Sequence, residues 1–326
     1  MDRDTAPSRI RVAIVGECML ELGSDMLPTD MPAAYGGDTL NTATYLARLA
    51  GEGVSVEYVT ALGMDSASEW MLARWRADGI DTRSVLLDPL RRPGRYQIQL
   101  DANGERRFRY WRDGSAARQL LRHPGFPAVA DRLRAADCLY LSGISLAILP
   151  DEDRMRMLGV VQEARARGAR IVFDSNYRPT LWQDAGQARA WDARMLPYVD
   201  VALVTHDDEA ALWGDANPDA TLQRLTDSAA RVVVVKLGAA GCLACRDGVI
   251  HPVAARLVET VVDTTAAGDA FNGGFLAASL RGLDIVTCCE IGNRAAAIVI
   301  GQHGAIAERV LTEPLAAALR FGRDAA

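Results

Sequence analysis

Apolar residues occur along the chain in short continuous runs that alternate with segments of helical periodicity. The runs that predict strands are RVAIVGECMLEL, VEYVTAL, DCLYLSGI, RIVFDSN, VDVALVT and RVVVVKLG. The segments between them predict helices at residues 39–49, 66–78, 151–167, 191–196 and 221–229. Because most runs are apolar throughout rather than alternating, we expect their strands to be buried on both faces. Repeated β–α units then predict a mainly parallel central sheet in a three-layer α/β/α architecture.

One segment, RYQIQLDANGERRFRYWR, has a different pattern, because its apolar residues alternate with polar ones. Tyr96, Ile98 and Leu100 share one face of a predicted strand. The sequence DANGE predicts a turn, and Phe108 and Tyr110 alternate in the same way beyond it. We therefore predict a hairpin with one covered face and one solvated face.

The region at residues 23–35 is also irregular. Together with the hairpin it predicts a small β-sheet lid, formed by segments at approximately 18–37 and 90–114. The sequence has no repeat, no low-complexity tract and no clear linker. We expect a single domain over residues 1–326 that carries this lid as an insertion.

Charge and hydropathy narrow the classes of partner. The 326 residues carry a formal net charge of -6, which argues against a nucleic-acid partner but leaves room for a local basic pocket. The N-terminal sequence MDRDTAPSR lacks an apolar signal region. The most apolar stretch, CLYLSGISLAIL, is too short for a membrane helix, which needs roughly 20 residues. We expect a cytoplasmic protein with no membrane partner.

The stretch VVDTTAAGDAF places a carboxylate, Asp269, among small residues where a strand pattern gives way to a helix. Small residues at a helix start let backbone N–H groups approach a ligand closely, and the helix N-terminus favours negative charge. A carboxylate beside a bound phosphoryl group could accept the proton of an attacking hydroxyl. Alternatively, Asp269 caps the helix. The peptide alone favours neither interpretation.

Two further glycine-bearing segments, GGDTLN and VKLGAAG, follow strand-like patterns and could also bring the backbone against a ligand. Neither is followed by the GKS or GKT of a P-loop, and no GxGxxG opens the first β–α turn. A P-loop site or a Rossmann dinucleotide site is therefore disfavoured.

The ordered set GGDTLN, GERRFRYWRDGSAAR, YLSGISLAIL, FDSNYRP, KLGAAG and DTTAAGDAFNGGF resembles the ribokinase-like (PfkB) carbohydrate kinases. The resemblance extends from Gly16 to about Ala305. Within the family, YWR followed by SAAR and NYRP is similar to the 2-keto-3-deoxygluconate kinase branch.

The resemblance implies a ribokinase-like fold and ATP-dependent, Mg²⁺-assisted phosphorylation of 2-keto-3-deoxygluconate to its 6-phosphate. The alternatives are a kinase of another sugar, such as a ketohexose or a related aldonate, and a catalytically silent sugar-binding protein on the same scaffold. The partners implied are the sugar acid and ATP. A homo-oligomer is also expected.

The same resemblance implies roles for residues of the catalytic and sugar sites. Asp269 is expected to be the catalytic base, and the amides of Ala267, Gly268 and Asp269 to form an anion hole. Arg178 is expected near both the substrate and the nucleotide phosphates. The residues expected to contact the sugar, directly or from the lid, are Gly37, Asp38, Asn41, Tyr96, Tyr110 and Arg112.

For the nucleotide site, the resemblance implies a second set of residues. The residues expected to line the ATP site are Asn176, Lys236, Gly238, Gly241, Ala266, Ala267, Gly268 and Asn293. A water-mediated metal contact is expected from Glu209, and a potassium ion is allowed near Asp263 and Thr265.

The chain departs from the family pattern at three places. Ala266 stands where many members have glycine, and His206 stands where the NxxE motif has asparagine, although Glu209 keeps the carboxylate. Glu21 stands where relatives often have a shorter aspartate, so it either contacts the substrate differently or faces the lid.

Independently of the resemblance, a planar guanidinium has donors spaced to match a carboxylate. Arg112 follows an aromatic pair on the hairpin, so its stem can pack while its head faces the cleft. The alternative is a solvated surface arginine, which is the interpretation adopted for Arg106, Arg107 and Arg109.

Overall fold

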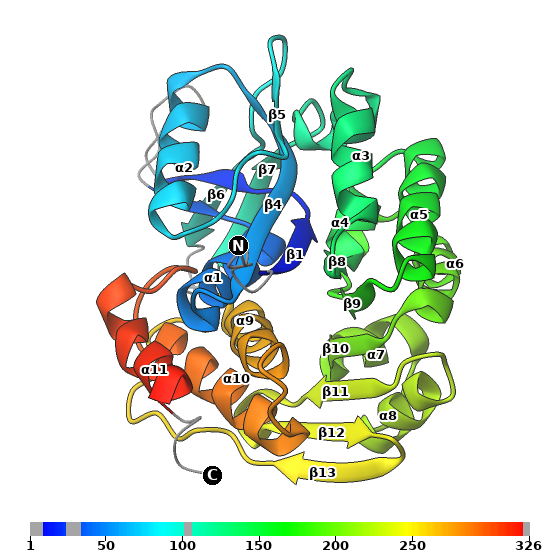
Figure 1. The fold of residues 1–326 in the computed structure, drawn as a ribbon, viewed down its shortest axis with the longest axis vertical. Helices are drawn as coiled ribbons and strands as arrows, with labels where there is room; N and C mark the ends of the chain where they lie inside the picture. The colour runs from blue at the N-terminus through cyan, green and yellow to red at the C-terminus, as the bar shows by residue number, and fades with distance from the viewer. Residues whose placement is uncertain (1–8, 24–33, 101–105, 322–326) are drawn as a thin grey trace, which may run out of the picture.

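The computed structural model describes residues 9–23, 34–100 and 106–321. In these ranges, nine strands form one large sheet in the order β13-β12-β11-β10-β9-β8-β1-β4-β5 (Figure 1). Only the β11–β12 and β12–β13 pairs are antiparallel. The strands of this sheet are β1 (Ile10–Val15), β4 (Val54–Gly63), β5 (Val85–Asp88), β8 (Cys138–Ser142), β9 (Arg170–Asp174), β10 (Val201–Thr205), β11 (Val232–Lys236), β12 (Cys242–Arg246) and β13 (Val249–Val253).

Helices cover both faces of the large sheet, as Figure 1 shows, with α1, α9, α10 and α11 on one side and α3, α5, α6 and α8 on the other. The helices are α1 (Asp38–Ala50), α2 (Ser66–Ala77), α3 (Phe126–Arg134), α4 (Gly143–Ala147), α5 (Asp151–Ala166), α6 (Ala185–Met195), α7 (His206–Trp213), α8 (Pro218–Thr226), α9 (Ala267–Ser279), α10 (Ile285–Ile300) and α11 (Arg309–Phe321). Within the described ranges, none is both long and apolar enough to span a membrane.

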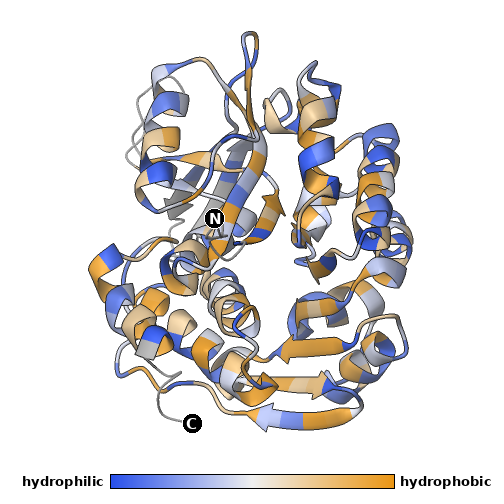
Figure 2. Ribbon diagram, in the orientation of Figure 1, coloured by the Kyte–Doolittle hydropathy of each residue, from blue (hydrophilic) through white to orange (hydrophobic). Residues whose placement is uncertain are grey.

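Two hydrophobic cores lie on opposite faces of the large sheet. In β1, Val12 and Ile14 contribute to one core, whereas Ala13 and Val15 contribute to the other. The strands are accordingly apolar along most of their length, while polar residues lie on the outer helices (Figure 2). The predicted three-layer architecture with a mainly parallel sheet is therefore confirmed.

A second, four-stranded sheet has the order β3-β2-β6-β7 and is formed by β2 (Met19–Leu22), β3 (Ala34–Gly36), β6 (Arg95–Leu100) and β7 (Arg106–Trp111). All four strands come from the segments predicted for the lid. The sheet is mixed, because β2 pairs with β6 in parallel while β2–β3 and β6–β7 are antiparallel.

The run from Arg11 to Leu22, predicted as one strand-like segment, is divided between the two sheets. The break occurs at Gly16, where a Cβ atom would lie 2.0 Å from Oγ1 of Thr39. Close approach of α1 at this point therefore requires glycine, and the chain leaves the large sheet after β1.

The hairpin was predicted to have one covered and one solvated face, and the structure differs from this prediction. At the start of β6 both Tyr96 and its neighbour Gln97 are buried, and Gln97 donates a hydrogen bond from Nε2 to the carbonyl oxygen of Gly23 at 2.8 Å. Tyr110 lies opposite Tyr96 in the register, yet it is 47% exposed. The side chains of residues 98, 100 and 108 and the predicted turn at residues 101–105 lie outside the described part.

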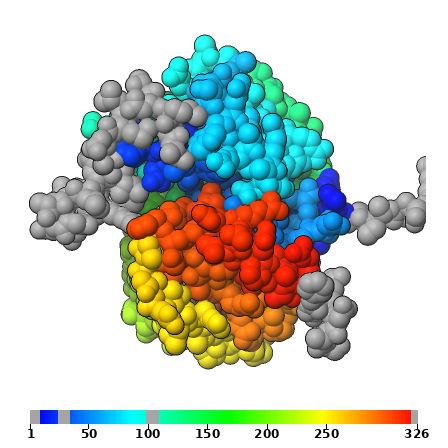
Figure 3. Space-filling model, turned by 90° about the vertical axis from the view of Figure 1, so that its left-hand side faces the viewer, coloured from blue at the N-terminus to red at the C-terminus, as the bar shows by residue number. Residues whose placement is uncertain are grey.

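Segments from the two ends of the chain meet on one side of the molecule. Figure 3 shows the C-terminal helical segment, in orange and red, directly beside the N-terminal third, in blue and cyan. Tyr45 of α1 contributes to this contact, because its hydroxyl donates to the carbonyl oxygen of Ala305 at 3.0 Å and accepts from the amide of Ala307 at 2.9 Å.

Helices α1 and α9 approach each other closely because Gly273 has no side chain. A Cβ atom there would lie 2.6 Å from Cβ of Tyr45 and 2.9 Å from the carbonyl oxygen of Thr42. Both contacts are made by groups that cannot easily move. The spacing between the two helices is therefore fixed at Gly273.

We predict that Gly273→Ala lowers the free energy of unfolding by about 1–3 kcal/mol, because it overpacks this contact. It should also lower kcat by separating the side chains that α1 and α9 carry. A control is Gly159→Ala in α5, where a Cβ atom would meet nothing within 4 Å. That change should raise stability by about 0.5–1 kcal/mol. Denaturant unfolding of both variants tests the pair, and equal stability would contradict the packing argument.

Candidate active site

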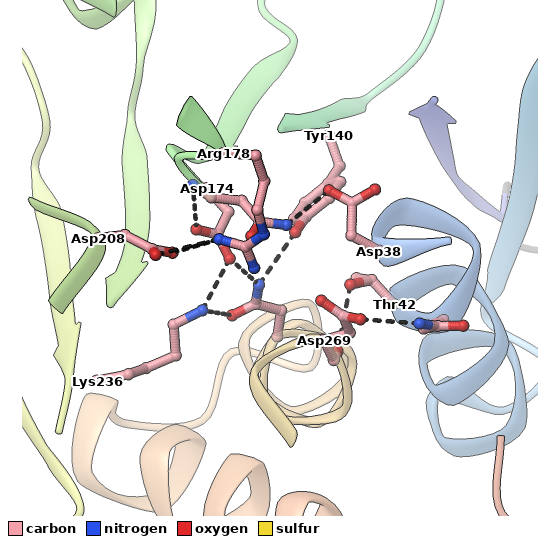
Figure 4. A network of polar contacts seen from close by, with 11 residues as sticks. Asp38, Thr42, Tyr140, Asp174, Arg178, Asp208, Lys236 and Asp269 are labelled. Atoms are coloured by element: carbon pink, nitrogen blue, oxygen red, sulfur yellow. Dashed lines mark hydrogen bonds and ion pairs between the residues drawn. The ribbon is translucent and has the colours of Figure 1, made fainter. Parts of the chain in front are cut away.

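Carboxylates from distant parts of the sequence meet at the carboxyl edge of the large sheet (Figure 4). Asp174 ends β9, Asp38 begins α1, and Asp269 and Asp208 lie in the first turns of α9 and α7. At this edge, strand ends and helix N-termini converge, and open parallel sheets bind ligands there.

Asp269 is held by α1. Its Oδ2 accepts a hydrogen bond from Nδ2 of Asn41 at 2.8 Å, and its carbonyl oxygen accepts one from Oγ1 of Thr42 at 3.2 Å. The N-cap residue of α9 is Ala266, in the left-handed conformation with φ of 61°. Within the described residues, no backbone amide donates a hydrogen bond to the Asp269 carboxylate, so the helix-cap interpretation is not favoured.

The surroundings of Asp269 favour its neutral form. Burial raises the pKa of Asp269 to about 7, and the negative charges of Asp38 and Asp174 act in the same direction. The hydrogen bond from Asn41 and the charge of Lys236 oppose the rise in pKa. A carboxyl group with a pKa near neutrality is suited to accept and release a proton.

Lys236, at the end of β11, belongs to a buried polar network. Its Nζ atom lies 2.8 Å from Oδ2 of Asp174 and 3.1 Å from Oδ1 of Asn272. Asn272, on α9, donates from Nδ2 to Asp174 at 2.7 Å and to the hydroxyl of Tyr140 at 3.0 Å. The network fixes the ammonium group beside the first turn of α9, because Nζ lies 3.4 Å from where a Cβ atom on Gly268 would be.

The first turn of α9 supplies backbone donors to this space. The first N–H groups of a helix have no acceptor within the helix and favour anions. Of the three amides predicted for the anion hole, that of Ala267 donates to the carbonyl oxygen of Thr264 at 3.3 Å. The amides of Gly268 and Asp269 are therefore the better candidates for a ligand.

A cavity of about 350 Å³ opens on the other side of the same turn. Among its lining residues are six of the eight predicted for the ATP site, namely Lys236, Gly238, Gly241, Ala267, Gly268 and Asn293. Sequence reasoning missed its apolar wall, which includes Ala255, Leu257, Val258, Phe271, Ala296 and Ile300. An apolar cavity beside a helix N-terminus could hold a planar base on one side and phosphates on the other.

Asn176 and Ala266 are not among the residues that line this cavity. Asn176 instead donates from Nδ2 to Oδ2 of Asp38 at 2.8 Å, so its side chain lies on the α1 side of the edge. Its φ of 35° is uncommon for a residue with a side chain. The amide of Asn176 donates to Oδ1 of Asp174 at 3.1 Å, which stabilises this turn.

A larger hollow of about 490 Å³ lies at the opposite edge of the sheet, where β9, β10 and β11 begin. It contains none of the residues predicted for the site, and two of its arginines are paired with Asp200 and Asp247. The smaller cavity is the relevant one, because it adjoins Lys236 and the first turn of α9.

The glycines of GGDTLN contact protein rather than open space. A Cβ atom on Gly37 would lie 2.2 Å from the carbonyl oxygen of Glu17, and one on Gly36 would lie 2.9 Å from the hydroxyl of Tyr96. That hydroxyl donates to Oε2 of Glu21 at 2.5 Å. Glu21 is thus a partner of Tyr96 within the small sheet.

Among the predicted site residues, Arg112 has the position that differs most from the prediction. The sequence suggested a head group that faces an open cleft, but the side chain is only 8% exposed and forms an ion pair with Glu17. Glu17 is buried as well, and a buried carboxylate requires a counter-charge. The aromatic neighbour Tyr110 lies under this guanidinium, with 5.9 Å between the guanidinium carbon and the ring centroid.

Arg178 is half exposed and lies near the carboxyl edge. Its Nη1 donates to the carboxylate of Asp208 at 3.1 Å and 3.2 Å, and to the carbonyl oxygen of Tyr177 at 2.8 Å. The pKa of Tyr110 is raised by burial, while the positive charges of both Arg112 and Arg178 oppose that rise. Tyr110 therefore lies within the electrostatic reach of both guanidinium groups. Asp208 was missed, although the acidic run HDDE gave a signal.

The two residues proposed for metal binding both have protein partners. Glu209 is fully buried, and its Oε2 accepts from Nη2 of Arg224 at 2.5 Å. Asp263 accepts from the amides of Thr265 at 2.9 Å and Gly304 at 3.1 Å. These hydrogen bonds use both oxygens of Asp263 but only Oε2 of Glu209. The roles of both carboxylates toward magnesium and potassium stay predictions.

Comparisons with known proteins provide evidence that does not depend on the geometry of this site. The family model described as pfkB family carbohydrate kinase matches residues 9–312. The 2-dehydro-3-deoxygluconokinase of Haemophilus influenzae is 47% identical over 306 residues, which cover 92% of this chain and 96% of that protein.

Solved structures agree with the family match. The PfkB protein from Polaromonas sp. is similar with a TM-score of 0.77 and 27% identity, covering 94% of this chain and all of that one. The fructokinase with bound ATP from Xylella fastidiosa has a TM-score of 0.79, covers 97% and 99% of the two chains, and at 22% identity supports the fold alone. The chain belongs to the pfkB family of carbohydrate kinases.

Proposed function

We propose that this protein transfers the γ-phosphoryl group of ATP to the terminal primary hydroxyl of 2-keto-3-deoxygluconate and forms the 6-phosphate. The observation that carries the proposal is the position of Asp269. This carboxyl group, whose pKa is raised to about 7, lies between Asn41 of α1 and a cavity suited to a nucleotide. The name of the Haemophilus influenzae relative, which refers to the same sugar acid, supports the choice of substrate.

In the proposed reaction, Asp269 accepts the proton of the substrate hydroxyl as the hydroxyl oxygen attacks the γ-phosphorus. The new O–P bond forms while the bond to the β-phosphate oxygen breaks, and ADP leaves. The first-turn amides of α9 and the ammonium group of Lys236 stabilise the negative charge on the transferred group.

The nucleotide would place its base and ribose in the apolar cavity and its phosphates toward Lys236. Magnesium would be held mainly by phosphate oxygens and water, its usual mode at such sites. Over the described ranges, no group of three or more His, Cys, Asp or Glu side chains is suited to hold a metal ion. Asp174 and Asp208, whose carboxylates face the same space, would contact its water ligands (Figure 4). The ion would neutralise charge on the phosphates.

A carboxylate on the substrate is favoured by the two arginines near the mouth of the site. The positive charges of Arg178 and Arg112 both act on Tyr110, and the guanidinium carbon of Arg112 lies 5.9 Å from the centroid of its ring. Guanidinium groups match planar carboxylates with paired hydrogen bonds. A neutral ketohexose would offer no charged acceptor to the guanidinium donors that Glu17 and Asp208 do not use.

We predict that 2-keto-3-deoxygluconate has a kcat/KM roughly tenfold to a hundredfold higher than a neutral ketose of the same length. The reason is that a hydrogen bond to a charged group contributes about 1.5–3 kcal/mol. A coupled assay of ADP release over a panel of sugars and sugar acids measures the ratio. A preference for a ketohexose or an aldonate would make that sugar the substrate in place of 2-keto-3-deoxygluconate. No turnover on any member of the panel would indicate a silent binding protein.

Asp269→Asn should lower kcat by roughly 10²–10⁴-fold, because the amide keeps the shape of the carboxylate but cannot accept the proton. ATP affinity, measured by calorimetry, should change little. The comparison variant is Asp284→Asn, which alters an exposed N-cap carboxylate of α10 next to Ile285, at the opposite edge of the sheet from the site. Near-normal turnover by Asp269→Asn would show that Asp269 is not the base.

The raised pKa of Asp269 also predicts a pH-dependent effect on stability. The charged form destabilises the folded protein, so this effect is absent below about pH 4 and complete above about pH 7. Asp269→Asn should therefore raise the free energy of unfolding by about 1–3 kcal/mol at pH 8 and by much less at pH 4.5. Thermal unfolding at both pH values measures the difference.

Asp284→Asn should change the stability at pH 8 in the opposite direction. Its hydrogen bonds with Thr287 lower the pKa of Asp284, so its charged form stabilises the fold at pH 8. That variant should be destabilised at pH 8 relative to the wild type. An Asp269→Asn protein that is less stable than the wild type at pH 8 would contradict the electrostatic description of the site.

A further inference from the structure

Glu17 lies where the chain passes between the two sheets. It belongs to the connection from β1 to β2. Three other connections of the small sheet approach it, namely those between β3 and α1, before β6 and after β7. A Cβ atom on Gly37, between β3 and α1, would lie 2.2 Å from the Glu17 carbonyl oxygen. A Cβ atom on Gly94, just before β6, would lie 2.9 Å from Oε1. Arg112 and Ser115, beyond β7, complete the set.

The carboxylate of Glu17 is bound from the last of these connections. Oε2 accepts a hydrogen bond from Nη2 of Arg112, and Oε1 accepts one from the hydroxyl of Ser115 at 2.5 Å. The side chain of Glu17 is 1% exposed. Both carboxylate oxygens are therefore used to hold the segment that follows the lid hairpin.

Arg112 retains donors that Glu17 does not use. Among the described residues, its buried Nε atom has no hydrogen-bond acceptor. A buried donor without a partner destabilises the folded protein, and a ligand acceptor would remove that penalty. The guanidinium lies over the ring of Tyr110, and its partner Glu17 contacts Gly37, the residue before Asp38, so the pair adjoins the α1 side of the site.

Pairing changes how a guanidinium selects an anion. A free arginine attracts carboxylates and nucleotide phosphates alike, and it loses rotamer freedom when a ligand orders it. A paired arginine is already ordered, and the pair that it forms with its carboxylate has little net charge. It therefore favours an acceptor that fits its remaining donors, which is a condition on shape as much as on charge.

We propose that Glu17 is a positioning residue, which fixes Arg112 so that the remaining donors of the guanidinium meet the carboxylate of the substrate. This inference rests on the proposed sugar-acid kinase activity. Glu17 itself does not contact the substrate. Its contribution is to the specificity for an acid over a neutral sugar.

Glu17→Asp tests the inference, because it keeps the charge but shortens the side chain by one methylene group and draws Arg112 away from its place. We expect the KM for 2-keto-3-deoxygluconate to rise about tenfold, while kcat and the KM for ATP stay within about twofold. The kcat/KM for a neutral ketose should stay within about twofold as well. In an Arg112→Ala background, Glu17→Asp should produce no further change in the KM for the acid.

The chain offers a matched control. Glu57 of β4 is also buried, and it too is bound by one arginine and one serine, Arg132 and Ser84. It lies on the strand that neighbours β1, at the position paired with Ala13, away from the carboxyl edge. Glu57→Asp should lower stability without changing the KM for the acid. Ser115→Ala, which removes only a neutral donor to Glu17, should raise that KM two- to threefold and serves if Glu17→Asp does not fold.

Three results would overturn the inference. Equal changes on the acid and the neutral sugar would make Glu17 a purely structural residue. An unchanged KM for the acid would remove Glu17 from specificity. A lower KM for the acid in Glu17→Gln would show that Glu17 competes with the substrate for Arg112. Wild-type enzyme that fails to phosphorylate the acid would reject the proposed function itself, which keeps the two failures distinct.

Discussion

The mutual repulsion of carboxylates at one edge of the large sheet is the constraint to which the rest of the site responds. Burial raises the pKa of both Asp38 and Asp269, the negative charge of Asp174 adds to both shifts, and that of Asp38 adds to the shift of Asp269. Lys236 and Arg178 offset part of the charge through Asp174 and Asp208. The remaining imbalance leaves one carboxyl group, that of Asp269, near its titration point at neutral pH. The raised pKa that suits Asp269 to proton transfer also lowers the stability of the fold, so the two effects have the same electrostatic origin.

The backbone around this edge is arranged to hold the charged groups at fixed separations. Gly273 lets α1 and α9 approach closely, which brings Asn41 to Asp269. The buried amide of Asn272 joins Asp174 to Tyr140 and Lys236, so three strands and a helix share one network. The small sheet is attached through Glu17 in a comparable way. In both places a buried charge is satisfied by residues from separate segments, and the segments are thereby fixed relative to one another.

The sequence predicted the features that depend on local pattern. Continuous apolar runs indicated a sheet buried on both faces, and the small residues of DTTAAGD indicated a turn open to a ligand. Six of the eight residues expected at the nucleotide site line one cavity. These successes have a common cause, because each feature is determined within a few residues or by a motif with a fixed role.

Features that depend on partners far apart in the sequence were not predictable in this way. Glu17 and Arg112 are 95 positions apart, and no periodicity links them. The placement of Asn176 beside Asp38 spans 138 positions. The division of residues 11–22 between two sheets depends on contact of Gly16 with Thr39. In each case the tertiary contact, rather than local preference, determines the outcome.

The most direct test of the account is the identity of the product formed from 2-keto-3-deoxygluconate and magnesium-ATP, measured by ³¹P NMR without proton decoupling. Transfer to the terminal primary hydroxyl predicts a new phosphate monoester signal, split by the hydrogens on carbon 6, that grows in step with ADP. A monoester on a secondary hydroxyl would contradict the proposed orientation of the sugar toward Asp269. Release of inorganic phosphate with no ester would contradict the assignment of the site as a sugar-acid kinase.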